Sequence, residues 1–250
     1  MLRAIQGALT LLFLLVAGCA QMPGGGSAGH ERLSNAIAID DVDFIRDAVK
    51  SRQLGINQHI STPGFQEGAP IILIAARHGS LVTLRYLISA GADLNAQAPT
   101  GETALMMASY FAGEEGSRSG RHEEAVRVLV EAGASLENAP YHYTPLGYAA
   151  YKGHDRIVRY LIERGARVDG DVRDGTAYVN TPLMMASIQG HTDTALWLLR
   201  AGADARVRIY LGATASELAQ RNRHANLAGL LKCAEGLAPS EKFSPQRCGR

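Results

Sequence analysis

The stretch that decides the fold is TPLGYAAYKGH at residues 144–154, which recurs as TPLMMASIQGH at residues 181–191. In each copy ten residues separate the Thr from the His, and a Gly-Ala pair begins 21 residues after the Thr. The same spacing is found at residues 103–134, once an insertion is removed, at residues 70–95, and in degraded form at residues 214–231. Self-similarity at a fixed period of roughly 33 residues indicates an array of stacked repeats.

Elementary physical chemistry accounts for the recurring residues. The hydroxyl of Thr144 can accept a hydrogen bond from the first turn of a helix, and Pro145 suits that turn because it has no N–H to leave unpaired. The alanine pair that follows allows neighbouring helices to approach closely. Gly153 is predicted to make the turn between two helices, and Gly165 to end the second helix in a left-handed conformation. Each copy is therefore expected to fold as a helix pair.

These residues resemble the ankyrin repeat, whose T-P-L-H-x-A-A-x-x-G-H signature they reproduce, and the resemblance covers about residues 32–232. It implies an all-α fold, an ankyrin-repeat solenoid of about five helix-pair repeats with short β-hairpin-like fingers between them. Residues 33–57 lack the Thr-Pro start and are predicted to form an N-terminal capping helix pair. Trp197 stands among leucines in a second helix, so we expect it in the core. Residues 233–250 are expected to form a C-terminal tail.

The resemblance also implies a protein-binding surface. In ankyrin-like stacks, the two positions after the alanine pair and the finger residues before Thr-Pro line the concave side. Carried over position by position, the helix residues are Arg77, His78, Tyr110, Phe111, Tyr151, Lys152, Ile188 and Gln189, and the finger residues are Glu102, Tyr141, His142, Tyr143, Tyr178, Asn180 and Tyr210. Six of the nine tyrosines fall in this set, and exposed aromatic side chains are typical of interface hot spots. The alternative is that these tyrosines only pack between the fingers.

Two segments break the period, and such loops are where binding residues are often found. Residues 112–121 contain a polar, glycine-rich insertion of about nine residues. This insertion is interpreted either as a tolerated surface loop or as a loop that contacts a partner. Between Ala166 and Thr181 the chain is about four residues longer than its equivalents, which is predicted to lengthen one finger.

The N-terminal segment is expected to direct the protein to the cell envelope. Residues 1–18 have a weakly basic start and an apolar run too short to span a bilayer, which is typical of a signal peptide. Residues 15–19, LVAGC, resemble the lipobox of bacterial lipoproteins, which implies that Cys19 is lipidated. Residues 19–31 are then the lipidated Cys and a flexible tether, and Ala20 in place of Asp favours the outer membrane, facing the periplasm. The alternative is an ordinary signal peptide with a chance Cys.

The remaining two cysteines are Cys233 and Cys248. In an oxidising compartment an isolated pair is expected to form a disulfide, which would staple the tail to the end of the last repeat. The alternative is a pair of free thiols.

Composition argues against other classes of function. Lys and Arg number 25 against 24 Asp and Glu, without long blocks, so nucleic-acid binding is not expected. Four histidines occupy the Gly-His slot and are interpreted as turn and cap residues: His122, His154, His191 and His224. The other histidines lack ligand-like spacing, and no nucleophile elbow or phosphate loop is present. We therefore expect no metal, no cofactor, no enzyme activity, and a monomer.

Together these observations predict a non-enzymatic protein-binding module anchored in the envelope, whose partner is a periplasmic protein. One version is an inhibitor or immunity protein that neutralises a toxin or an envelope enzyme. Other versions are a scaffold or protective partner of a periplasmic enzyme in stress defence, and a structural spacer of the envelope. A hydrolase or metalloprotein is the competing class.

Overall fold

A computed structural model describes residues 27–112, 119–137, 143–173, 175–177, 179–210, 212–237, 241 and 243–248 of the chain. Several sequence predictions fall outside these residues: the signal peptide and Cys19, most of the insertion at residues 113–118, and the finger residues Tyr141, His142 and Tyr178.

The described residues form six successive helix pairs and a short C-terminal helix. The first helix of each pair is termed an inner helix, and the second an outer helix. The inner helices are α1 (Ser27–Ala38), α3 (Ile71–His78), α5 (Ala104–Phe111), α7 (Pro145–Lys152), α9 (Pro182–Gln189) and α11 (Ala215–Arg221). The outer helices are α2 (Val42–Lys50), α4 (Leu81–Ser89), α6 (Ser119–Glu131), α8 (Asp155–Glu163), α10 (Thr192–Arg200) and α12 (Ala225–Glu235), and α13 (Pro245–Cys248) follows.

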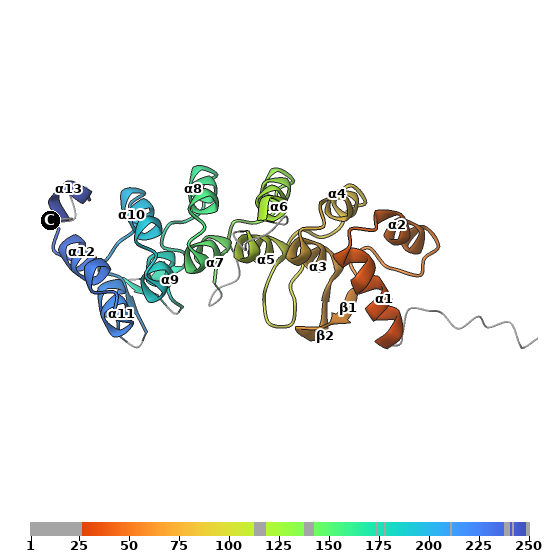
Figure 1. Cartoon of the computed structure of the whole chain (residues 1–250), viewed down its shortest axis with the longest axis horizontal. Coiled ribbons are helices and arrows are strands. Elements are labelled where there is room, and N and C mark those ends of the chain that lie inside the picture. Colours follow the sequence, from red (N-terminus) through yellow and green to blue (C-terminus); the bar gives the residue numbers. More distant parts are fainter. Residues whose placement is uncertain are drawn as a thin grey trace, which may run out of the picture.

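The helix pairs stack into an elongated solenoid. Each inner helix contacts the next inner helix along the chain, and the two rows of helices are seen side by side in Figure 1. An inner helix is covered by its two neighbours and by its own outer helix, which is why residues 71–76 of α3 are all buried. The all-α solenoid with a capping pair at its N-terminal end is therefore confirmed. Helix α1 begins at Ser27, so the last part of the segment predicted as a tether is helical.

Short strands form the fingers, which project from the row of inner helices (Figure 1). Strands β1 (His59–Thr62) and β2 (Phe65–Pro70) make an antiparallel hairpin before α3. The finger predicted to be long contains the antiparallel strands β3 (Val172–Arg173) and β4 (Thr176–Ala177). Strand β5 (Arg208–Ile209) of the following finger pairs with β4 in parallel. This pairing joins two fingers, and the repeat pattern alone did not predict it.

The Thr-Pro slot caps the inner helices as expected. Thr144 and Thr181 adopt extended backbone conformations, and their hydroxyls accept hydrogen bonds from the N–H groups of Gly147 (3.1 Å) and Met184 (3.3 Å). A proline occupies the first turn of both helices. Each hydroxyl thus satisfies one backbone donor that the helix cannot pair itself.

Replacing Thr144 with alanine is expected to lower the free energy of unfolding by about 1 kcal/mol, because the buried N–H of Gly147 loses its acceptor. Urea denaturation followed by circular dichroism measures this loss. Thr144→Ser retains the hydroxyl and should remain close to the wild type. Equal losses in the two variants would show that the cap is not the cause.

The histidines of the Gly-His slot link neighbouring repeats. His154, His191 and His224 stand at the N-cap positions of outer helices, as predicted, but their side chains do not cap those helices. His122 differs from the prediction, because α6 begins at Ser119 and so contains it. The Nε2–H of each of the four histidines instead donates to a carbonyl of the inner helix in the preceding repeat, and the hydroxyl of Ser80, in the same slot, donates to the carbonyl of Ile37. The bonds run from His122 to Arg77 (2.9 Å), His154 to Tyr110 (3.0 Å), His191 to Tyr151 (3.1 Å) and His224 to Ile188 (3.1 Å).

A second row of hydrogen bonds joins the loops that follow the outer helices. In each case a side-chain oxygen accepts the backbone N–H of the corresponding loop in the next repeat. The pairs are Asn57 with Asp93 (2.8 Å), Asn95 with Ser135 (2.8 Å), Glu137 with Arg167 (2.7 Å) and Asp169 with Asp204 (3.2 Å). The polar contacts thus repeat along the array, as the stacking of similar units requires.

Two further predictions concern the C-terminal half. Cys233 and Cys248 are joined by a disulfide with a Cα–Cα distance of 5.5 Å, which holds α13 beside α12. Trp197 differs from the prediction that it belongs to the core. It packs against the core but is only partly buried, and the guanidinium groups of Arg159 and Arg200 lie over its ring, 4.9 and 5.3 Å from the centroid. An indole can contact the core with one side and a cation with the other.

Candidate protein-binding surface

The helix residues predicted to bind a partner are the last two residues of successive inner helices. Arg77 and His78 end α3, Tyr110 and Phe111 end α5, Tyr151 and Lys152 end α7, and Ile188 and Gln189 end α9. Because α3, α5, α7 and α9 contact one another in order, these pairs form a row along one edge of the solenoid. All of them except Gln189 are half-buried, and Gln189 is exposed.

Four tyrosines in the middle of this row contact one another, and we term Tyr110, Tyr143, Tyr148 and Tyr151 the tyrosine cluster. The ring of Tyr110 lies 5.9 Å from that of Tyr148, edge to face, and 6.3 Å from that of Tyr151, in a stacked arrangement. Tyr143, from the finger before α7, meets Tyr148 at 6.0 Å. All four remain half-buried, so packing between finger and helix leaves part of each ring accessible.

Cationic side chains lie over the aromatic rings of this surface. The Nζ of Lys152 is 4.7 Å from the centroid of Tyr110. The guanidinium of Arg77 lies between two rings, 5.2 Å from the centroid of Phe65 and 5.8 Å from that of Phe111. Such cation–π contacts hold both partners in place at a modest gain in stability. The surface therefore presents aromatic area together with positive charge.

Phe65 and Tyr148 were missing from the sequence prediction. Tyr148 precedes the alanine pair, a position outside the two helix-end positions that the resemblance selects. Its spacing of three residues from Tyr151 could have placed it on the same helix face. Phe65 belongs to the first finger, which lacks a repeat motif. Ile188 and Gln189 end α9, and Tyr210 is largely exposed in the finger after α10.

The position of Tyr148 inside the cluster changes its acidity. Burial, and then the negative charges of Glu102 and of ionised Tyr143 and Tyr110, raise the pKa of Tyr148 from 10.0 to about 12. The folded state thus favours the neutral phenol. This contribution to stability is fully present below pH 10 and is lost as the pH rises towards 12.

Spectrophotometric titration of the tyrosines checks this shift. We expect one phenol of the folded chain to ionise near pH 12, and that late step to be missing in Tyr148→Phe. If the curves of the wild type and Tyr148→Phe differ only by one phenol with the ordinary pKa of 10.0, the buried position of Tyr148 is contradicted.

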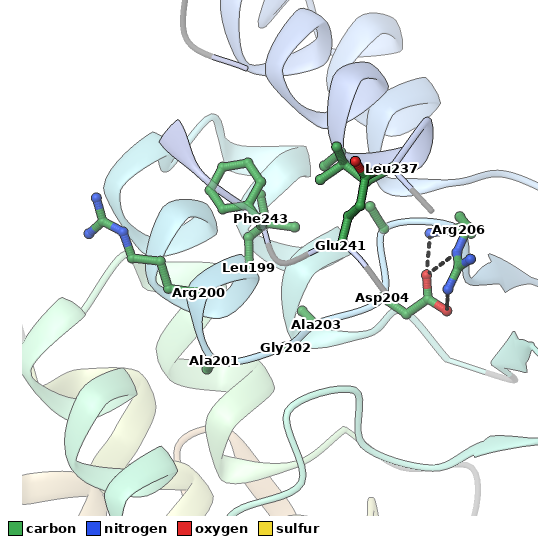
Figure 2. A pocket seen from close by; sticks show the side chains of 12 residues that line it. Leu199, Arg200, Ala201, Gly202, Ala203, Asp204, Arg206, Leu237, Glu241 and Phe243 are labelled. Atoms are coloured by element: carbon green, nitrogen blue, oxygen red, sulfur yellow. Dashed lines mark hydrogen bonds and ion pairs between the residues drawn. The ribbon is translucent and has the colours of Figure 1, made fainter. Parts of the chain in front are cut away.

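A surface cavity of about 510 Å³ lies at the C-terminal end of the solenoid, between residues 199–206 and the tail (Figure 2). Leu199, Leu237 and Phe243 supply apolar lining. Three of its charged groups take part in ion pairs: Arg206 Nε donates to Asp204 at 2.8 Å, and Glu241 accepts from Arg247, which lies outside the cavity, at 2.6 Å. A fourth, Arg200, lies over the ring of Trp197.

The described residues contain neither a cluster suited to a metal ion nor a helix that could span a membrane. None of their His, Cys, Asp and Glu side chains form a group of three or more placed to hold a metal ion. Within the same residues, each helix is too short or too polar to cross a bilayer.

Comparison with known proteins agrees with this architecture. A family model described as ankyrin repeats matches the chain in three overlapping copies, at residues 41–138, 72–174 and 116–209. The chain is 32% identical over 136 residues to the "Ankyrin repeat and KH domain-containing protein mask-1" of Caenorhabditis elegans, a match that covers 53% of the chain and 5% of that protein. It is 36% identical over 133 residues to the "Ankyrin repeat and SOCS box protein 16" of Mus musculus, covering 52% of the chain and 28% of that protein.

The match to the "Leucine-rich repeat serine/threonine-protein kinase 1" of Mus musculus extends over 199 residues at 27% identity, and covers 73% of the chain and 9% of the kinase. The chain thus spans less than a third of each of these relatives. The family-model matches cover more than half of the chain, and their repeats coincide with the helix pairs of the structure. The chain therefore belongs to the ankyrin-repeat family.

Proposed function

We propose that this chain is a non-enzymatic protein-binding module, and that its partner docks on the tyrosine cluster and the adjoining cations. Ankyrin repeats are protein-interaction modules, and the observation that supports this site is the set of half-buried, mutually packed rings of Tyr110, Tyr143, Tyr148 and Tyr151. Tyrosines held in this way lose little conformational entropy on binding and are frequent hot spots. The similarity to a kinase covers 9% of that protein, so no kinase activity is carried over.

The proposed place of action is the periplasmic face of the outer membrane, with Cys19 as the lipidated residue. The support is the LVAGC sequence at residues 15–19 and the Ala that follows it. Several acyl chains on one residue would hold the protein on a membrane, because each buried methylene contributes about 0.8 kcal/mol. Metabolic labelling with radioactive palmitate tests the anchor. Label that persists in Cys19→Ser would rule out this residue.

The partner itself can be found by affinity capture. The full chain would be compared with a Tyr110→Ser/Tyr143→Ser/Tyr151→Ser variant as bait for an envelope extract. We expect a periplasmic protein retained by the first bait and lost from the second. A structural spacer of the envelope would retain no partner that depends on these tyrosines. Deletion of residues 113–118 in a third bait tests whether the insertion contributes contacts.

Two versions of the proposal differ in what binding does to the partner. An inhibitor or immunity protein lowers the activity of the captured protein when added in equimolar amount. A scaffold or protective partner leaves that activity unchanged and slows its loss under heat or oxidation. Assaying the captured protein with and without the full chain separates the two.

A further inference from the structure

Arg77 is a cation of the binding surface whose guanidinium is contacted by two other elements of the fold. Its guanidinium lies between the rings of Phe65, on the first finger, and Phe111, at the end of α5. One edge donates from Nη1 to the carbonyl of Pro63 at 3.2 Å. Arg77 itself belongs to α3 and the contacts come from α5 and the first finger, so two other elements of the fold fix the orientation of its side chain.

The finger leaves space for this guanidinium through a glycine. A Cβ atom added at Gly64 would lie 2.6 Å from Nη1 and 3.1 Å from Nη2 of Arg77, which is closer than van der Waals contact permits. Gly64 also has a φ of +93°, a conformation that side chains rarely adopt. A side chain at residue 64 would therefore displace the guanidinium of Arg77 from its present position at the tip of the finger.

Most of the hydrogen-bonding capacity of Arg77 is unused within the described residues. A guanidinium carries five N–H donors, and the single bond to Pro63 uses one of them. Among the described carboxylates, none forms an ion pair with Arg77, whereas other arginines such as Arg85 and Arg206 do have carboxylate partners. A half-buried, fixed guanidinium with several vacant donors is suited to a planar, two-oxygen acceptor.

The charge at the helix ends favours an anionic acceptor. The eight residues that end α3, α5, α7 and α9 include Arg77 and Lys152 but no Asp or Glu, whereas the finger residue Glu102 places one negative charge near Tyr148. The chain as a whole has a net charge of only +1, so it lacks the strong field that draws proteins to nucleic-acid phosphates. A carboxylate on a protein partner fits both observations.

We propose that Arg77 is a preorganised anchor for an Asp or Glu side chain of the partner, which forms a two-pronged contact with the guanidinium while neighbouring partner residues pack on the tyrosine cluster. This inference rests on the proposed function, because it names the chemistry of the partner segment at the same surface. Preorganisation matters because a side chain that is already ordered loses less entropy when it binds.

The test uses a display library of short random peptides selected on the immobilised full chain. We expect enriched peptides to share an Asp or Glu beside aromatic or apolar residues. For a synthetic copy of one such peptide, Arg77→Lys should weaken binding by about tenfold or more, because Lys keeps the charge but loses the planar fork. Replacing the peptide's acid by its amide should weaken binding similarly in the wild type, and have little further effect in Arg77→Lys.

Arg159→Lys is the matched control, because Arg159 also lies over an aromatic ring, that of Trp197 on the outer row of helices, at 4.9 Å. The affinity of the Arg159→Lys variant for the peptide should stay within about twofold of that of the wild type. Peptides that bind only through a free C-terminal carboxylate, or that are displaced by oligonucleotides, would overturn the assignment of a side-chain carboxylate.

The outcomes separate this inference from the proposed function. If selected peptides depend on Tyr110 and Tyr151 but lack acidic residues and tolerate Arg77→Lys, the anchor is wrong and the binding surface stands. If no peptide distinguishes the wild type from Tyr110→Ser/Tyr151→Ser, both the surface and the anchor are overturned.

Discussion

Serine substitution at Tyr110, Tyr143 and Tyr151 is expected to weaken binding of the captured partner at least about a hundredfold, with the helical content unchanged. Hot-spot residues each contribute about 2 kcal/mol or more, and a hundredfold change corresponds to about 2.7 kcal/mol. The effect should be large because the three rings pack on one another and on Tyr148, so that truncating them removes a continuous aromatic surface. Titration calorimetry with the captured protein measures the affinity.

The matched control is Tyr86→Ser. Tyr86 is also half-buried and carries a cation over its ring, Arg46 at 5.6 Å, but it lies on the outer helix α4. The Tyr86→Ser substitution should leave the affinity for the captured protein within about twofold of that of the wild type. Equal losses in the control and the triple variant would mean that general destabilisation, and not the tyrosine cluster, explains the effect.

Gly190→Ala is expected to lower the free energy of unfolding by about 3 kcal/mol. The residue has a φ of +78°, which costs a side chain roughly 1–2 kcal/mol. The added Cβ would also lie 2.5 Å from Nδ1 of His224. The ring must then move and lose its bond to the carbonyl of Ile188, at a further cost of about 1–2 kcal/mol. Urea denaturation monitored by circular dichroism gives the difference.

Gly202→Ala separates the two causes. Gly202 has a φ of +100°, and a Cβ built there meets no atom within 4 Å. Its substitution should therefore show the backbone cost alone, about 1–2 kcal/mol. If Gly190→Ala and Gly202→Ala lose the same stability, the close approach of His224 contributes nothing.

The helix pairs were predictable from sequence because each slot has a local cause. Thr144 caps a helix, Gly153 adopts a left-handed turn, and both act within a few residues of their own position. The role of His154 was only half predictable. Its place at the start of an outer helix follows from the repeat, but its hydrogen bond to Tyr110 spans 44 residues and depends on how neighbouring repeats stack.

The binding surface was predictable only where it follows the repeat. The helix-end residues, such as Tyr110 and Tyr151, are brought together as the resemblance implied. Tyr148 and Phe65 lie outside the positions that it selects, and their contacts are set by the fingers. The pairing of β4 with β5 is likewise a contact between two loops that differ from the repeat pattern, so periodicity carries no information about it.

The disulfide between Cys233 and Cys248 makes the two ends of the array unequal. In a linear stack, where each unit touches only its neighbours, loss of order starts most easily at an end that has a single neighbour. A covalent cross-link opposes such fraying at the last repeat, whereas the described residues of α1 and α2 contain no cysteine. Unfolding should therefore begin at the N-terminal repeat. This repeat lies next to the segment that would carry any mechanical force from the proposed lipid anchor.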